Sequence, residues 1–222
     1  MDILDLIDWI NYCAEALLGA VFALICFRQA GKFKGARLFF LLLAGFFGCV
    51  FMSDVFYMLT WIIEDFPFVF SAGDISWIGG YLFLITAALS LTDEWVPEQR
   101  EAVRKYRWPA LAGPAVCVIF NVVFISLYPQ LVVNYLLYAV PTAILLYLSL
   151  WLFLLSRKGG LQPGLRLYHL AVLVWLSLQM VCDLFSTLRL VQIFAALSTV
   201  FWYIVMFIMP SIYFAARKGI VE

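Results

Sequence analysis

The stretch RLFFLLLAGFFGCVFMSDVFYMLTWII, residues 37–63, decides what kind of molecule this is. It opens with an arginine and is then almost wholly apolar, except that one carboxylate, Asp54, stands inside it. At a rise of 1.5 Å per residue, a helix of this length reaches about 40 Å, which exceeds a hydrocarbon core of about 30 Å. The stretch therefore predicts a transmembrane helix that carries an acidic side chain within the membrane.

The rest of the chain has the same character. Of its 222 residues, 66% are hydrophobic and 13% are charged, with a mean hydropathy of +1.02, whereas an ordinary soluble domain is about 25% charged. We predict an all-α polytopic membrane protein, one domain over residues 1–222, with seven transmembrane helices. The predicted spans cover residues 8–27, 37–63, 67–92, 108–128, 131–155, 165–187 and 190–215. Membrane lipids are the expected surroundings, and no nucleic-acid partner is expected.

The basic residues predict the orientation. Of the fourteen Lys and Arg residues, all but Arg189 fall between spans 1 and 2, 3 and 4, or 5 and 6, or after span 7. By the positive-inside rule, the amino terminus lies outside and the carboxyl terminus in the cytoplasm. The acidic start MDILDLIDW lacks the basic region of a signal peptide, so the first span is expected to be retained. A prokaryotic plasma membrane is the expected location.

An internal repeat divides the chain. Residues 35–59 align with 164–188 without a gap, and the alignment matches a Gly, an Arg and an intramembrane Asp at identical spacing. The matched pairs are Gly35 with Gly164, Arg37 with Arg166 and Asp54 with Asp183. Weaker echoes pair Asn11-Tyr12 with Asn134-Tyr135, and Ser76 and Tyr81 with Ser198 and Tyr203. The chain thus reads as two three-helix units, about 8–92 and 131–215, joined by a linker helix at about 108–128. Because a single linker helix crosses the membrane between them, both units are predicted to have the same orientation in the membrane, which makes the repeat parallel.

Four carboxylates are predicted to converge on one layer in the outer part of the bilayer. Asp54 and Asp183 each lie 17 residues beyond an arginine, which places both roughly 25 Å above the cytoplasmic edge. Glu15 and Asp74 enter the same layer from the outer side. The expected neighbours are polar and aromatic, so we predict an outer-facing pocket for a small-molecule or lipid ligand. Its predicted binding residues are Glu15, Asp74, Gln179, Asn121, Ser53, Trp77 and Tyr81.

The chemistry of such a pocket leaves several alternatives open. Two aspartates facing each other across a pseudo-twofold axis would share a proton and suit acid–base catalysis; Asp54 and Asp183 are the predicted catalytic pair. The same residues suit cation binding with or without proton coupling, and a purely structural polar network is a third reading. A hard cation held by the four carboxylates is a further alternative, but no metal site and no cofactor is predicted.

The motifs around both aspartates resemble those of the lysoplasmalogenase family. The segments that carry the resemblance are LAGFFGCVFMSDVFYML (43–59), DISWIGGYLFLI (74–85) and LSLQMVCDLFSTL (176–188). The resemblance implies hydrolysis of a vinyl ether lipid, with Asp54 and Asp183 as the acid and base. The seven-span topology also resembles the three-one-three architecture of sugar transporters, microbial opsins and KDEL receptors.

Three functions therefore compete. The leading hypothesis is an intramembrane hydrolase of lipid-like vinyl ethers. The alternatives are a small-solute or cation transporter that uses the same aspartates, and a seven-helix sensory or receptor module. Homo-oligomerisation is left open by the sequence.

Overall fold

The computed structural model describes residues 3–64, 71–95, 100–127, 129, 132–156, 163–187 and 192–221. Its elements are α1 (Ile3–Lys32), the short 3-10 helix η1 (Lys34–Ala36), α2 (Arg37–Glu64), α3 (Ala72–Trp95), α4 (Arg100–Ala110), α5 (Ala112–Leu127), α6 (Val132–Ser156), α7 (Pro163–Thr187) and α8 (Gln192–Val221). Within these ranges, seven helical spans are long and apolar enough to cross a membrane. The predicted class, an all-α integral membrane protein with seven candidate spans, is confirmed.

The fourth span is built from two helical pieces. Pro114 has no N–H to donate to the carbonyl of Ala110, and its ring crowds the preceding turn. The helix is accordingly interrupted at Leu111, whose N–H donates to the carbonyl of Trp108 at 3.1 Å. Regular bonding resumes when Ala115 donates to Leu111 at 3.0 Å. The span therefore runs from Arg104 through α4 and α5, starting before the predicted residue 108.

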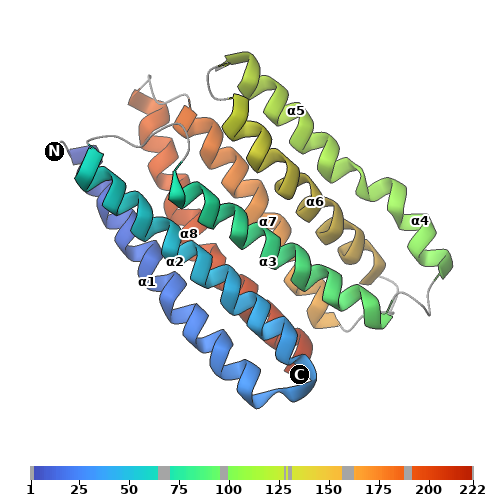
Figure 1. Cartoon of the computed structure of the whole chain (residues 1–222). Coiled ribbons are helices and arrows are strands. Elements are labelled where there is room, and N and C mark those ends of the chain that lie inside the picture. The colour runs from blue at the N-terminus through green and yellow to red at the C-terminus, as the bar shows by residue number, and fades with distance from the viewer. Residues whose placement is uncertain are drawn as a thin grey trace.

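The helices pack as two groups with a peripheral fourth span (Figure 1). Helix α2 packs against α1 and α3, while α7 packs against α6 and α8. Contacts between α3 and α6 and between α1 and α8 join the groups. Helices α4 and α5 lie along one edge of the bundle in Figure 1, next to α6, and α1 lies along the opposite edge. Helices α2 and α7 are thus the central helices of the two groups.

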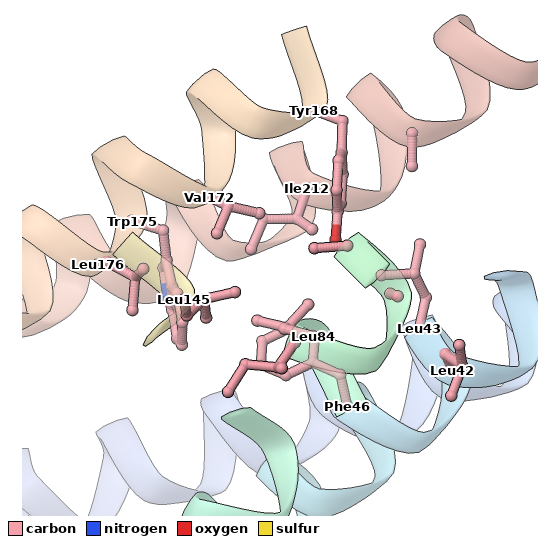
Figure 2. Close-up of a cluster of buried hydrophobic side chains, with 14 of the residues drawn as sticks. Leu42, Leu43, Phe46, Leu84, Leu145, Tyr168, Val172, Trp175, Leu176 and Ile212 are labelled. Carbon is pink, nitrogen blue, oxygen red and sulfur yellow. The ribbon is translucent and has the colours of Figure 1, made fainter. Parts of the chain in front are cut away.

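The apolar core lies where the two groups meet. Figure 2 shows Phe46 of α2, Leu84 of α3, Leu145 of α6 and Trp175 of α7 in this cluster. The Trp175 indole is fully buried, and its ring centroid lies 5.4 Å from that of Phe46. Large apolar side chains also cover the outside of the bundle, as expected for a surface that faces lipid tails.

Helices α1 and α2 approach closely at Gly19. A Cβ atom at this position would lie 2.9 Å from the backbone nitrogen of Phe51 and 3.0 Å from the carbonyl oxygen of Phe47. Backbone atoms cannot rotate away as a side chain can. Gly19 therefore permits close contact between α1 and α2, as small residues commonly do between transmembrane helices.

We expect Gly19→Ala to destabilise the protein by about 1–3 kcal/mol, because the added methyl group forces α1 away from α2. Thermal unfolding in detergent, followed by tryptophan fluorescence, should show a melting temperature lower by several degrees. Gly31→Ala on the same helix is the matched control, since a Cβ atom there meets nothing within 4 Å and alanine favours the helix. An equal fall in melting temperature in the two variants would contradict the close contact of α1 and α2 at Gly19.

Candidate functional site

A cavity of about 310 Å³ lies near the end of the bundle where α1 begins and α2 ends. It is lined by residues from α1, α2, α3, α5, α6, α7 and α8, so it lies between the two helix groups and the fourth span. Among the described residues, nine of its lining side chains are aromatic. They are Tyr12, Tyr57, Trp77, Tyr81, Phe120, Phe124, Tyr135, Tyr138 and Trp202.

The structure brings six of the nine predicted site residues to this cavity. They are Asp74, Trp77, Tyr81, Asn121, Gln179 and Asp183. The other three, Glu15, Ser53 and Asp54, are fully buried and are not among the lining residues. The four carboxylates of the predicted acidic layer therefore occupy different environments, two at the cavity and two buried outside it.

Asp74 is bound by four hydrogen bonds from protein groups. Its Oδ1 accepts from the hydroxyl of Tyr57 on α2 at 2.7 Å and from the hydroxyl of Tyr138 on α6 at 2.6 Å. Its Oδ2 accepts from the backbone N–H of Ser71 at 2.6 Å and from the Ser71 hydroxyl at 2.9 Å. These bonds use the acceptor capacity of a carboxylate. Asp74 is thus a fixed structural anion of the cavity wall.

The Ser71 bonds form a capping box at the start of α3. Ser71 precedes the first helical residue, and Asp74 is the third residue of the helix. Their mutual bonds satisfy amide groups that a helix start leaves unpaired. The segment Ser-Ala-Gly-Asp, residues 71–74, carries this signature in the sequence. Gly73 leaves room for the Tyr57 ring, which a Cβ atom there would meet at 2.9 Å.

Asp183 is the accessible carboxylate of the cavity. It is exposed and lines the cavity wall, and it accepts a hydrogen bond of 3.3 Å from Nε2 of Gln179, one turn earlier on α7. Among the described residues, Oε1 of Gln179 is buried and has no hydrogen-bond partner. The part of the cavity wall that α7 forms therefore combines a carboxylate with an amide side chain.

Glu15 and Asp54 form a buried pair outside the cavity. Both side chains are 0% exposed, and the charge of Glu15 on α1 acts on Asp54 of α2. Their neighbour Ser53 donates to the carbonyl of Gly73 at 2.8 Å, which ties α2 to the first turn of α3. Asp54 and Asp183 therefore do not face each other across one cavity, although they are equivalent in the sequence repeat.

The inner wall of the cavity rests on the apolar core. Trp77 stacks on Trp175 with ring centroids 6.0 Å apart, and Tyr81 also lies 6.0 Å from Trp175. Both Trp77 and Tyr81 line the cavity, whereas Trp175 is buried behind them. Large rings in mutual contact fix the shape of this wall, because they have few alternative positions in a close-packed core.

Sequence reasoning named some of the aromatic wall and missed the rest. Tyr12 and Tyr135 are matched by the weak repeat echo in the first helix of each unit, and both line the cavity. Tyr138 lies three residues beyond Tyr135 and so on the same side of α6, a spacing that points to it. Nothing in the sequence marks Trp202 and Phe120 as cavity residues, because aromatic residues are frequent throughout the chain.

The arrangement suits a positively charged ligand. Aromatic faces attract cations, Asp183 supplies a negative charge, and no lysine or arginine is among the lining residues that the structure describes. Nor, within those residues, does any group of three or more Asp, Glu, His or Cys side chains form a potential metal site.

Comparison of this chain with known protein families, with curated proteins and with solved structures finds no match. Its function must therefore be argued from the site.

We expect Tyr138→Phe to destabilise the protein by about 1.5–3 kcal/mol, because it removes a hydrogen bond to a charged, buried acceptor. Tyr147→Phe is the matched control on the same helix, since none of the hydrogen bonds of the described residues involves the Tyr147 hydroxyl. Thermal unfolding of both variants in detergent tests this expectation. If both variants melt like the wild type, the Asp74 bonds do not contribute to stability as the geometry requires.

Proposed function

We propose that the protein is a membrane transporter that binds a small organic cation in the aromatic cavity. The observation that carries the proposal is the exposed Asp183 carboxylate in a cavity with nine aromatic lining residues and no basic one among the described residues. The structural anion Asp74 adds negative charge to the wall, while its hydrogen bonds leave Asp183 as the carboxylate that a ligand can approach.

A quaternary ammonium group matches this chemistry. Such a group has no N–H to donate and is bound in proteins by aromatic faces, at about 0.5–2 kcal/mol per favourable contact. The volume of about 310 Å³ stands at the small end of ligand pockets, which favours a compact solute over a long lipid chain. The side-chain amide of Gln179, which also lines the cavity, would hydrogen-bond to a hydroxyl or amine elsewhere on the ligand.

The arrangement of the helices supports transport. A parallel repeat of two three-helix units would place the cavity at the interface between the units, as in transporters that alternate access around a central site. Pro141 lies inside α6 between the lining residues Ala139 and Thr142, so this helix lacks one regular hydrogen bond beside the cavity. By the positive-inside rule the cavity would open toward the outside, because the described basic residues lie toward the opposite ends of the helices.

Paired-aspartate hydrolysis has less support from the geometry. A mechanism in which Asp54 and Asp183 act as acid and base needs both carboxylates at one reacting bond. Asp183 lines the cavity, whereas Asp54 is fully buried beside Glu15. Hydrolysis would therefore require Asp54 to move to the cavity, whereas cation binding by Asp183 requires no movement of Asp54.

We expect the purified protein in lipid nanodiscs to bind choline, with a change in tryptophan fluorescence because Trp77 and Trp202 line the cavity. Its neutral isostere 3,3-dimethylbutanol should bind at least about tenfold more weakly, since it lacks the charge. Asp183→Asn should also weaken choline binding by about tenfold or more. Asp8→Asn on α1 is the matched control and should bind like the wild type, because Asp8 is not among the lining residues.

Uptake distinguishes the remaining functions. Accumulation of labelled choline in proteoliposomes, lost in Asp183→Asn, is the result expected of a transporter. Choline binding without uptake would assign the molecule to the receptor alternative. Aldehyde release from an alkenyl lysophospholipid, abolished by Asp54→Asn and Asp183→Asn alike, would overturn the proposal in favour of the hydrolase.

A further inference from the structure

The buried pair of Glu15 and Asp54 stands apart from every other carboxylate described in the structure. All four carboxylate oxygens are buried and lack a hydrogen-bond partner among the described residues. The Oδ1 of Asn11, one turn before Glu15 on α1, is buried and unpartnered as well. Asp74, in the same layer, has four donors, so the missing partners are a property of the pair and not of the layer.

Two buried negative charges without a partner are too costly to persist side by side. Desolvating one unpaired carboxylate costs several kcal/mol, and a second carboxylate nearby adds repulsion. The described lysines and arginines lie toward the opposite ends of the helices, so none compensates the pair. Within the described residues, no side chain supplies a positive charge to the pair.

We propose that Glu15 and Asp54 hold at least one proton between them, and that one proton leaves when an organic cation enters the cavity. With one proton, one carboxyl group becomes a neutral O–H donor and the other stays an acceptor, so the pair can satisfy part of its own hydrogen bonding. A proton suits the surroundings better than a metal ion, because the side chain that approaches Glu15 from α8 is Trp202, whose indole is a donor and offers no oxygen ligand.

Two side chains of the cavity wall are near the pair. The Trp202 indole lies beside Glu15 and also lines the cavity. Tyr81 of α3 lines the cavity too, and it is near enough to both Glu15 and Asp183 to be acted on by the charge of each. These are the groups that face the pair from α3 and α8; on its own helices, Asn11 and Tyr57 lie one turn away from Glu15 and Asp54, respectively.

The direction of the coupling follows from charge. A cation beside Asp183 favours the ionised form of a nearby carboxyl group and so favours proton loss from the pair. One positive charge enters the site and one leaves it, so the exchange is balanced. By linkage, the affinity for the cation rises with pH to the same extent that cation binding drives proton release. This coupling step rests on the proposed transport function, whereas proton binding by the pair does not.

Proton binding is tested without any ligand. If the folded protein holds a proton that the unfolded chain lacks near neutral pH, stability falls as the pH rises. The wild-type melting temperature in nanodiscs, measured in potassium buffer from pH 6 to 8, should fall by about 3 °C or more per pH unit relative to the double variant Glu15→Gln, Asp54→Asn. The double variant retains hydrogen-bonding capacity without charge, and Asp8→Asn should keep the wild-type slope.

Two results would overturn the proton assignment. One is an identical pH dependence of melting in the wild type and the double variant. The other is a melting temperature that rises with sodium at fixed pH, with no such rise in the double variant, since the pair would then bind sodium instead of a proton. Neither result depends on whether choline is the right ligand.

Coupling is tested by proton release. Adding choline to the wild type in weakly buffered solution with a pH indicator should release up to one proton per bound cation. The double variant should bind choline and release fewer protons per bound cation than the wild type, with an affinity that varies less with pH, because Asp183 is the titratable group that it retains at the cavity. If the double variant releases protons like the wild type, the coupling is wrong even where choline binding itself holds. If neither the wild type nor the double variant binds choline, the proposed function fails while the melting experiment still decides the protonation of the pair.

Discussion

The hydrogen bonds to Asp74 are the interaction on which the rest of the site depends. The Asp74 carboxylate caps the first turn of α3 through Ser71, and it accepts hydrogen bonds from Tyr57 of α2 and Tyr138 of α6. Helices α3 and α6 belong to different helix groups, so this anion joins the two groups beside the cavity. The aromatic wall is therefore positioned by a polar interaction at its rim as well as by ring packing around Trp175.

The sequence predicted the membrane class and the seven candidate spans, because these depend on the length and hydrophobicity of its apolar segments. It did not predict which way each carboxylate faces. The hydrophobic residues of α2 surround the helix on all sides, so no apolar stripe marks the face toward the core. The repeat implied equal environments for Asp54 and Asp183, but α1 presents Glu15 to the first, whereas the second lines the cavity. The environment of a side chain is set by the neighbouring helix, and a repeat in sequence does not repeat every neighbour.

Asp74 illustrates a different limit. Its position near the outer end of a span and its charge predicted a binding residue, and it does line the cavity. The same four-residue segment, however, begins with Ser71 and forms a capping box. A carboxylate that is fully hydrogen-bonded by the protein contributes a fixed field and no free acceptor. Local capping chemistry, readable from the spacing of Ser71 and Asp74, therefore separates a supporting role from a ligand-binding one.

The carboxylates near the cavity occupy three environments that differ in how the negative charge is compensated. This difference gives each carboxylate a different role. Asp74 is compensated by four protein donors and does not need a mobile partner. Asp183 is exposed and lines the cavity, where Gln179 donates a hydrogen bond to it. Glu15 and Asp54 are fully buried, and among the described residues only the Trp202 indole is placed to donate to Glu15, so a small ion that penetrates the packed interface would compensate them. A proton is the smallest such ion. Trp202 lies beside Glu15 and lines the cavity, and Tyr81 lines the cavity within electrostatic reach of Glu15, so a proton gained or lost at the pair acts on whatever occupies the cavity.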